Sequence, residues 1–345
     1  MACVDSAVNL SGGVATTLKD IAERSGVSMK TVSRVLNKEP NVSTLTRERV
    51  ERAATDLGYR PNLAARSLAS ARSHLVALLY DDISTAYALS LMQGASAACR
   101  ARGHHLVVEP IRDAELRDRT AVSRLLRHLN VDGLILTPPL CDNAVLLEAL
   151  DALDMTAVRL APARPDARHP CLSVNNREAA RGVVEHLIAL GHARIGFILG
   201  ARGHSARSAR LAGYRDALVA AGIAFVPERV AEGDFTWRSG RAAAGPLHAA
   251  GCTAIFASND DMAAGVLSWM GAQGLRAPED LAVAGFDDTA LSRLISPALT
   301  TVGQDVASMG ERAAALLIDG VGDVREVAFD CTLIVRHSSD PYMEL

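Results

Sequence analysis

Hydrophobic positions recur at helical spacing through the first sixty residues of the chain. Three short stretches carry apolar side chains three and four positions apart, which predicts three amphipathic helices. Gly26 and Gly58 follow the first and third stretches, as expected of residues that end helices. The side chains expected to face a shared core are Leu18, Ile21, Ala22, Val32, Val35, Leu36, Val50, Ala53, Ala54 and Leu57.

Hydroxyl-bearing residues stand where each of these helices would begin. Thr17 can cap the first helix, with Asp20 at the N3 position, and Ser28 can cap the second. Ser43 or Thr44 opens the third. Two short helices joined by a turn, with a third that completes the core, form the helix-turn-helix pattern of DNA-binding proteins.

The second helix would turn Met29, Lys30, Ser33 and Arg34 outward. Lys and Arg can donate to guanine edges and Met can contact a thymine methyl group, so this face suits a DNA major groove. Arg34 could equally contact a phosphate, which positions a protein without specifying a sequence. The alternative is a small helical core with a solvated charged face, because helical triplets are common.

Beyond residue 74 the pattern changes to short apolar runs that alternate with helical stretches of ten or more residues. Such runs are typical of buried strands in parallel sheets that helices cover. The predicted strands include 74–80, 104–110, 131–139, 193–200 and 252–260, and the predicted helices include 87–103, 121–130, 142–153, 179–191 and 210–222. Because this alternation of strands and helices occurs twice along the chain, we expect two doubly wound α/β lobes, with a ligand cleft outside the carboxyl ends of their strands.

The stretch between the two patterns, Tyr59–Ser70, has the position of a linker but the composition of a helix. It contains one proline and is otherwise rich in Ala, Leu and Arg, which favour helices. Asn62 can cap a helix of about two turns, shorter than the ~12–15 residues that an isolated helix needs. We therefore expect a segment that folds only with support from a partner. The alternative is a solvated linker with an incidental leucine.

Charge is more informative when it is divided along the chain. The net charge is −3, but residues 1–70 hold ten Lys and Arg against seven Asp and Glu, which leaves that segment at +3 and the remainder at −6. All three lysines lie there as well, although a bias towards Arg elsewhere would also explain this. The basic segment is a weak indication of nucleic-acid binding that needs a motif to support it.

The cysteines and the absence of targeting patterns indicate the cellular compartment of the protein. The six cysteines, at 3, 99, 141, 171, 252 and 331, form neither CxxC pairs nor a Cys/His metal spacing, so no metal is expected. Neither an export signal nor an apolar run long enough to span a membrane is visible. Scattered thiols without an export signal favour the cytoplasm. The Gly- and Ser-containing N-terminus predicts a disordered leader at 1–16.

Motifs for catalysis are not apparent in the chain. We find no phosphate-binding glycine motif and no nucleophile with a paired base, so neither a cofactor nor an enzyme, such as a sugar kinase, is expected. An exported sugar-binding protein is the other alternative. It would need an export signal and no helix-turn-helix segment, and the sequence shows the reverse.

The string TLKDIAERSGVSMKTVSRVLN, continued by VSTLTRERVERAATDLGYRPNLAARSLAS, closely resembles the DNA-binding headpiece of the lactose-repressor (LacI/GalR) family of bacterial transcription regulators. The residues that match base-reading positions are Met29, Lys30 and Arg34. Those that match phosphate-holding or capping positions are Thr17, Ser28, Thr31 and Ser33. In the family, a hinge helix enters the minor groove and a leucine opens the central base step. The matching hinge residues are Leu68 for the wedge, Asn62 for the cap and Arg66 near a phosphate.

The strings GHARIGFILG, RLAGYRDAL, IFASNDDMAAGVL and PEDLAVAGFDDT resemble the family's effector-binding core, which is similar to a periplasmic sugar-binding protein. The resemblance implies that Arg210 grips the effector, that Asp287 accepts its hydroxyl groups and that Phe235 packs on it. Asn259 and Gln304 match further polar contacts. The other residues expected at the cleft are Tyr80, Asp81, Tyr87, His204 and Ser205.

These residue types suit a sugar, because a carboxylate, an amide and a guanidinium can chelate adjacent hydroxyls while an aromatic face covers the ring. The loop ARGHSARSAR lacks a second arginine that nucleobase-binding members carry, which favours a carbohydrate. The alternatives are a nucleobase or nucleoside effector, or regulation without an effector. At single residues, Asp287 could instead cap a turn, Arg210 could form a surface ion pair, and Phe235 could belong to a core.

The resemblance implies a homodimeric repressor that binds a palindromic operator and responds to a small molecule. The chain ends in SSDPYMEL without a heptad repeat, so a dimer is expected rather than a tetramer held by a helical bundle. The expected divisions are a helix-turn-helix domain at 17–60, a hinge at 61–73 and a two-lobed core at 74–345. Within the core, the first lobe would hold about 74–172 with part of 305–328, and the second about 173–304 with the C-terminal strands.

Overall fold

The structure is a computed structural model that describes residues 16–36, 40–59, 72–81, 84–165, 168–340 and 342. The chain divides into two compact units, Met1–Ala71 and Arg72–Leu345. Most of the expected leader and hinge lies outside the described residues. None of the described helices combines the length and apolar character that a bilayer crossing requires.

The first unit contains the three predicted helices, α1 (Leu18–Ser25), α2 (Met29–Leu36) and α3 (Thr44–Asp56). Their inward residues form one buried cluster that includes Ile21 and Val32, as the periodicity predicts. Thr17 caps α1 in a capping box with Asp20, and Ser43 rather than Thr44 caps α3. Arginines of α3 join the helices, since Arg47 donates to the Val35 carbonyl and Arg49 to the Ser25 carbonyl.

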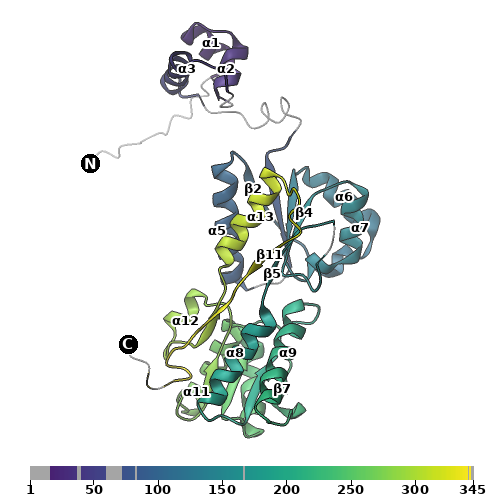
Figure 1. The fold of residues 1–345 in the computed structure, drawn as a ribbon, viewed down its shortest axis with the longest axis vertical. Coiled ribbons are helices and arrows are strands. Elements are labelled where there is room, and N and C mark those ends of the chain that lie inside the picture. Colours follow the sequence, from purple (N-terminus) through teal and green to yellow (C-terminus); the bar gives the residue numbers. More distant parts are fainter. Residues whose placement is uncertain are drawn as a thin grey trace, which may run out of the picture. The chain divides into compact units, whose positions relative to one another are not determined.

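The second unit begins with a lobe built on a six-stranded parallel sheet (Figure 1). The strand order is β11 (Glu326–Phe329), β5 (Cys171–Val174), β4 (Ala157–Leu160), β3 (Gly133–Leu136), β1 (Leu75–Tyr80) and β2 (His105–Pro110). Alternate residues of β1 enter different buried clusters, with Leu78 on one face and Leu79 on the other. Helices therefore cover both faces, and they are α5 (Thr85–Ala101), α6 (Arg119–Leu129), α7 (Ala144–Ala152) and α13 (Val306–Asp319).

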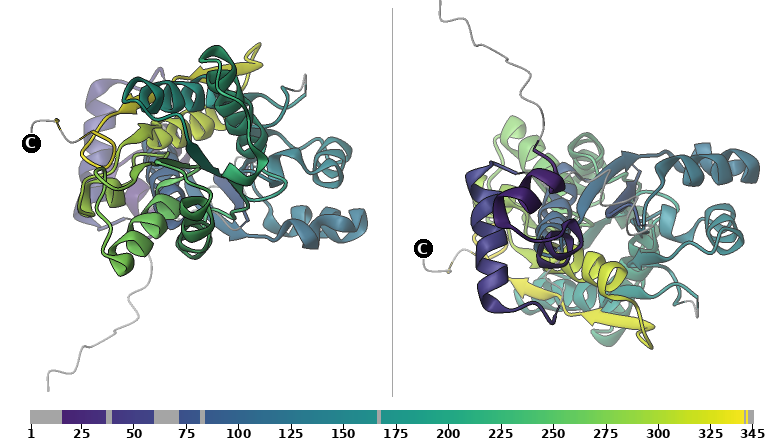
Figure 2. Two further views of the ribbon diagram at one scale, coloured as in Figure 1. Left: turned by 90° about the horizontal axis from the view of Figure 1, so that it is seen from below. Right: turned by 90° about the horizontal axis from the view of Figure 1, so that it is seen from above.

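The second lobe has a four-stranded parallel sheet in the order β7 (Val230–Ala231), β6 (Ile195–Ile198), β8 (Ala254–Ala257) and β9 (Ala282–Ala284). A two-stranded antiparallel sheet pairs β10 (Thr301–Gly303) with β12 (Thr332–Ile334). The helices of this lobe are α8 (Asn176–Ala189), α9 (Ser205–Ala220), α10 (Trp237–Ala249), α11 (Asp260–Gln273) and the short α12 (Ala290–Leu294). The views along the long axis show these helices outside the sheets (Figure 2). The predicted fold of two doubly wound lobes is confirmed.

Short 3-10 helices complete the connections at η1 (Asp113–Arg117), η2 (Leu140–Asp142) and η3 (Pro227–Arg229). Three segments of the described chain pass from one lobe to the other: β5 into α8, β10 into α13, and β11 into β12. The Asn175 side chain links two of them, because it accepts from the Cys331 amide at 2.9 Å and donates to Asp330 at 3.4 Å. Two of the three connections between the lobes, β5 to α8 and β11 to β12, are thus hydrogen-bonded to each other.

Strand β4 is absent from the sequence prediction. Arg159 interrupts its apolar run, and a charged residue argues against a strand that is buried on both faces. In the structure Arg159 is only 4% exposed, because it donates to the Cys141 carbonyl at 2.6 Å and to Asp142 at 2.7 Å. A buried ion pair therefore replaces the hydrophobic residue that the pattern required.

Candidate functional site

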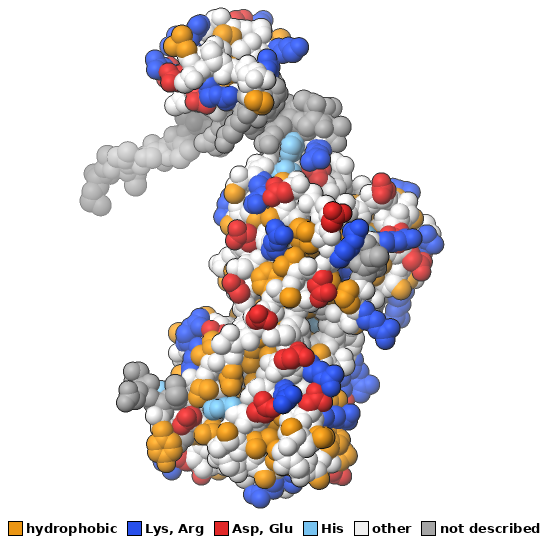
Figure 3. Space-filling model, viewed as in Figure 1, with side chains coloured by type: hydrophobic (Ala, Val, Ile, Leu, Met, Phe, Trp, Pro, Cys, Tyr) orange, Lys and Arg blue, Asp and Glu red, His pale blue; other side chains and the backbone are white. Residues whose placement is uncertain are grey.

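The outward face of α2 is where the headpiece has its expected DNA-contacting residues. Ser28, Met29 and Lys30 are exposed, and Met29 retains 56% exposure, which is high for a large apolar side chain. Thr31, Ser33 and Arg34 are half-buried. Exposed Lys and Arg side chains of this unit are visible in the space-filling view (Figure 3).

Local hydrogen bonds fix the geometry of this face. The Ser28 hydroxyl accepts from the Thr31 amide at 3.2 Å, as expected of an N-cap. Arg34 donates to the Pro40 carbonyl at 3.3 Å, so its guanidinium is oriented by the following loop. Gly26 sits between α1 and α2 with a φ of 68°, a left-handed conformation that favours glycine. The hinge residues Asn62, Arg66 and Leu68 lie outside the described residues.

A cavity opens in the second unit between the two lobes. Its lining residues follow the carboxyl ends of strands in both sheets, which is where ligands bind in doubly wound folds. Eight of the ten residues expected at the cleft line it: Tyr87, His204, Ser205, Arg210, Phe235, Asn259, Asp287 and Gln304. Tyr80 and Asp81, although described, are not among the residues that line this cavity.

Arg210 is the central cation of the cavity and is only 4% exposed. Its Nε donates to the Asn176 side chain at 2.9 Å, and another guanidinium nitrogen donates to the Ser258 carbonyl. The guanidinium carbon lies 3.5 Å from the centre of the Phe286 ring. Burial lowers the pKa of Arg210, and the nearby Asp287 opposes that shift. This packing holds the guanidinium in one orientation towards the cavity.

Asp287 faces Arg210 with 3.9 Å between a carboxylate oxygen and a guanidinium nitrogen. The same oxygen accepts from the Gln304 amide at 2.6 Å. Burial raises the pKa of Asp287 to about 8, although Arg210 and the bond from Gln304 oppose the shift. Its φ of 112° lies in the region that L-residues seldom adopt, and such strain is concentrated at functional sites.

A second carboxylate supports the loop that carries Asp287. Asp260 is fully buried and accepts from the Thr301 hydroxyl at 2.6 Å and from the Thr289 amide at 2.7 Å. Burial raises the pKa of Asp260 to about 6, against the effect of these hydrogen bonds. Thr289 lies two residues after Asp287 and Thr301 lies three residues before Gln304, so Asp260 fixes the backbone next to both cavity residues.

Asn259 lines the cavity, but its side chain is largely engaged within the protein. Its oxygen caps α11 by accepting from the Met262 amide at 2.9 Å, and its nitrogen donates to the Phe235 carbonyl at 2.9 Å. Phe235 has a φ of 68°, and its ring meets the His204 ring edge-on at 5.2 Å. Asn259 therefore positions the aromatic wall of the cavity, with only part of its polar capacity left for a ligand.

Ser205 makes a contact between the lobes. Its hydroxyl donates to the Ala161 carbonyl at 2.6 Å, which joins the start of α9 in the second lobe to the loop after β4 in the first. Gly203 lies close to Pro139 across the same gap, with 3.8 Å from an added Cβ to the proline. The two lobes thus meet at the rim of the cavity.

Five cavity residues are absent from the sequence prediction: Ser84, Pro138, Ala161, Asn176 and Ala206. Asn176 is the most consequential of them, because it is 7% exposed and orients the Arg210 guanidinium. Its place two residues after the end of strand β5 could have indicated a role at the cleft. The others are small or apolar, so their residue type carries no chemical indication.

Comparisons with known proteins agree with this architecture. A family model for bacterial regulatory proteins of the lacI family matches residues 17–62, and one for a periplasmic binding protein-like domain matches 184–339. The HTH-type transcriptional regulator GalR of Escherichia coli (strain K12) is 32% identical over 340 residues, covering 95% of this chain and 97% of the relative. This chain belongs to the lacI family of bacterial regulatory proteins.

Two solved structures of lacI-family regulators show the same fold. The transcriptional regulator CelR–cellobiose complex matches with a TM-score of 0.69 and 32% identity, covering 94% of this chain and 99% of that chain. The Lac repressor dimer bound to operator and the anti-inducer ONPF matches with a TM-score of 0.76 and 30% identity over the same shares. As a lacI-family member, the chain is a DNA-binding transcriptional regulator and not an enzyme.

Proposed function

We propose that the chain is a cytoplasmic repressor that binds a palindromic operator as a homodimer and that a carbohydrate in the interlobe cavity controls this binding. The observation that carries the effector part is the set formed by Arg210, Asp287 and Gln304 beside the Phe235 ring. A carboxyl group, an amide and a guanidinium can bind neighbouring hydroxyls, and the ring covers the apolar face of a sugar. The CelR–cellobiose complex supports this choice of ligand class.

On the DNA side, the exposed face of α2 supports a major-groove contact by Met29, Lys30 and Arg34. Thr17, Ser28, Thr31 and Ser33 are proposed to cap helices or to contact phosphates. One headpiece offers a small contact area, so two half-sites are needed for specific affinity. The Lac repressor dimer on its operator supports this arrangement.

Control follows from linkage between the two sites. A ligand changes operator affinity only to the extent that it prefers one arrangement of the core over another. The cavity is lined from both lobes, so a ligand within it contacts both and favours one relative orientation of them. We propose that residues 61–73, with Asn62, Arg66 and Leu68, transmit this orientation to the headpieces.

The deciding experiment selects an operator from a random DNA pool and measures binding by fluorescence anisotropy. We expect a palindromic sequence, an affinity that falls steeply as salt rises, and a shift of affinity with at least one sugar of a panel. Asp287→Asn should weaken the response to that sugar at least tenfold while operator binding without sugar stays unchanged. Asp323→Asn, at an exposed loop position, is the matched control.

Three results would contradict the proposal. Operator binding that does not depend on salt would argue against phosphate contacts by the headpiece. A response to purines or nucleosides and to no sugar would support the other effector class. A full sugar response in Asp287→Asn would place the effector outside this cavity.

A further inference from the structure

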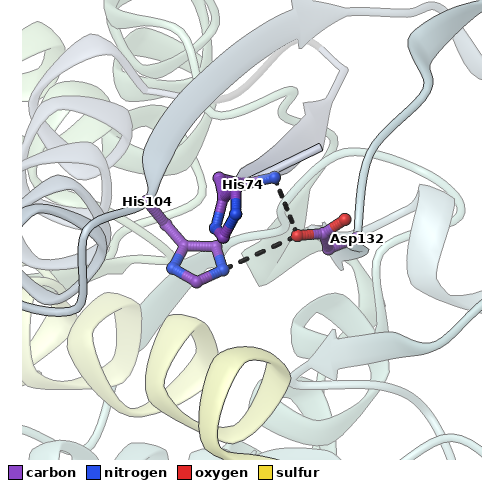
Figure 4. Close-up of side chains that lie close together, drawn as sticks. All are labelled: His74, His104 and Asp132. Atoms are coloured by element: carbon purple, nitrogen blue, oxygen red, sulfur yellow. Dashed lines mark hydrogen bonds and ion pairs between the residues drawn. The ribbon is translucent and has the colours of Figure 1, made fainter. Parts of the chain in front are cut away.

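Two histidines and an aspartate meet at the amino-terminal edge of the first sheet, at the opposite end of its strands from the cavity (Figure 4). His74 directly precedes β1, His104 precedes β2 and Asp132 precedes β3. These strands are neighbours in the order β3, β1, β2, so the residues before them lie side by side. They are separated by about thirty positions in the chain, which is why local Cys and His spacing does not reveal them.

The three side chains offer ligand atoms within 4.8 Å of one another. His104 Nε2 lies 3.6 Å from Asp132 Oδ2, which is longer than a hydrogen bond between such atoms. A nitrogen and an oxygen bound to one tetrahedral zinc ion, at about 2.0 to 2.2 Å each, stand roughly 3.4 Å apart. The observed separation is therefore close to that of two ligands of one metal ion.

The hydrogen bonds around His104 indicate which of its nitrogens is available. His104 Nδ1 lies 3.0 Å from the Arg102 carbonyl, an acceptor, so Nδ1 carries a hydrogen. In the neutral ring this leaves a lone pair on Nε2, directed towards the Asp132 carboxylate. Two lone pairs that face each other repel, and a bound cation relieves the repulsion. A backbone carbonyl that orients a ligating imidazole is also the usual outer contact of a metal-bound histidine.

Asp132 is held in place and keeps capacity for a metal. One carboxylate oxygen accepts from the Ser73 amide and hydroxyl, at 2.8 and 2.9 Å. The other accepts from the His74 amide at 2.9 Å. Since each carboxylate oxygen has about two acceptor positions, the oxygen nearest His104 retains one. These bonds fix the carboxylate without using the position that faces the imidazole.

Both histidines of the cluster are buried, whereas the aspartate is partly exposed. His74 is 7% exposed and His104 is 6% exposed, with their ring centres 5.0 Å apart. The Asp132 side chain keeps 19% exposure, so an ion and a water molecule can reach it from solvent. Two imidazoles, one carboxylate and a water match the ligand set of three protein groups and an open position that zinc accepts.

We propose that His74, His104 and Asp132 bind a divalent transition metal ion of the zinc class. His104 contributes Nε2, Asp132 contributes the oxygen opposite it, and His74 contributes a ring nitrogen after a small rotation of its side chain. The site fixes the first residues of the core unit, which begins at Arg72. This proposal rests on the geometry of the cluster and does not depend on the proposed effector.

The test uses the full chain after removal of metals with EDTA. Zinc ion is titrated in competition with a chromogenic chelator, and we expect one equivalent to bind. His104→Gln and His74→Asn should each weaken the binding at least a hundredfold. His105→Gln changes an exposed neighbour of His104 and should leave zinc affinity within twofold of the parent chain. Circular dichroism of each variant shows that it is folded before its affinity is compared.

A second measurement needs no substitution. Cobalt(II) should give visible absorption bands of a four-coordinate site, without the near-ultraviolet band of a thiolate ligand. Absence of stoichiometric binding would leave an ion pair between a protonated His104 and Asp132 and would overturn the proposal. A thiolate band would place the metal at one of the cysteines and would overturn it as well, as would equal loss of affinity in His105→Gln.

Discussion

At the scale of single residues, the cavity is organised by buried groups that hold one another in place. Arg210 contacts Asn176, the Ser258 carbonyl and the Phe286 ring, so groups of the protein itself hold its guanidinium in place. Asp287 is balanced between burial, which disfavours its charge, and Arg210, which favours it. Preorganised polar groups reduce the cost of ordering on binding.

The raised pKa of Asp287 predicts a pH dependence of stability. The folded carboxyl keeps its proton to about pH 8, whereas the unfolded carboxyl loses it near 3.8. Between these values the folded state binds more protons, so this group makes the free energy of unfolding fall as pH rises towards 8, by up to about 1.4 kcal/mol per pH unit.

Asp287→Asn removes the titration, and its free energy of unfolding should therefore fall less than that of the parent chain between pH 5 and 9. Urea unfolding at several pH values measures the difference, with Asp323→Asn as the exposed control. Parallel pH profiles for parent and Asp287→Asn would show that Asp287 is ionised throughout this range.

Which cavity residues the sequence can predict depends on their chemistry. Arg210, Asp287 and Gln304 stand in strings that resemble a known family, and their side chains suit a hydroxyl-rich ligand. Asn176 has the same polar character, but its role depends on Arg210, which lies 34 positions away. Contacts between distant segments form only through the tertiary fold, so a local pattern does not reveal them.

At the scale of elements, neighbouring helices approach closely where glycines lie in their interface. A Cβ added at Gly94 of α5 would stand 1.8 Å from the Ala307 carbonyl oxygen of α13, and one at Gly310 of α13 would stand 2.2 Å from the Leu91 carbonyl oxygen. The two backbones are thus in contact without intervening side chains. Because α13 returns to the first lobe late in the chain, this contact fixes a long-range pairing.

We expect Gly94→Ala to destabilise the chain by about 1–3 kcal/mol or more, because the methyl group forces α5 and α13 apart. Gly182→Ala is the matched control, since Gly182 lies inside α8 and has nothing within 4 Å of an added Cβ. That change should be neutral or stabilising by up to ~1 kcal/mol, because alanine favours helix. Urea unfolding midpoints compare the two, and equal effects would contradict the close approach.

The periodicity of apolar residues predicts helices and strands well where the buried side chains are apolar. The ten predicted strands and helices of the core are all confirmed, because their apolar runs enter the sheets or cover them. Strand β4 escapes prediction because Arg159 is buried through an ion pair with Asp142. Such a pair needs two segments to meet, and hydrophobic periodicity along one segment does not contain that information.

At the scale of the whole molecule, the core has two lobes, and residues of both line the cavity that holds Arg210 and Asp287. Ser205 and the Ala161 carbonyl hydrogen-bond across the rim. Loss of this bond should cost about 0.5–1.5 kcal/mol and favour separation of the lobes.

Ser205→Ala should therefore increase amide hydrogen exchange in residues 157–163, measured without ligand by mass spectrometry. Ser208→Ala is the matched control, because its hydroxyl donates to the Ser205 carbonyl within α9. Unchanged exchange in Ser205→Ala, or the same increase in Ser208→Ala, would show that this bond does not hold the lobes together.

Because three passages of the described chain join the lobes, cleavage of one of them does not separate the lobes. A protease that cuts one passage leaves the lobes connected by the other two. If the cut lies in the passage from β10 to α13, the hydrogen bonds of Asn175 to Asp330 and Cys331 also stay in place. A chain nicked at one passage would therefore remain one particle with an intact cavity. The effect of a ligand on such a nicked chain would show how much each connection restricts the relative orientation of the two lobes.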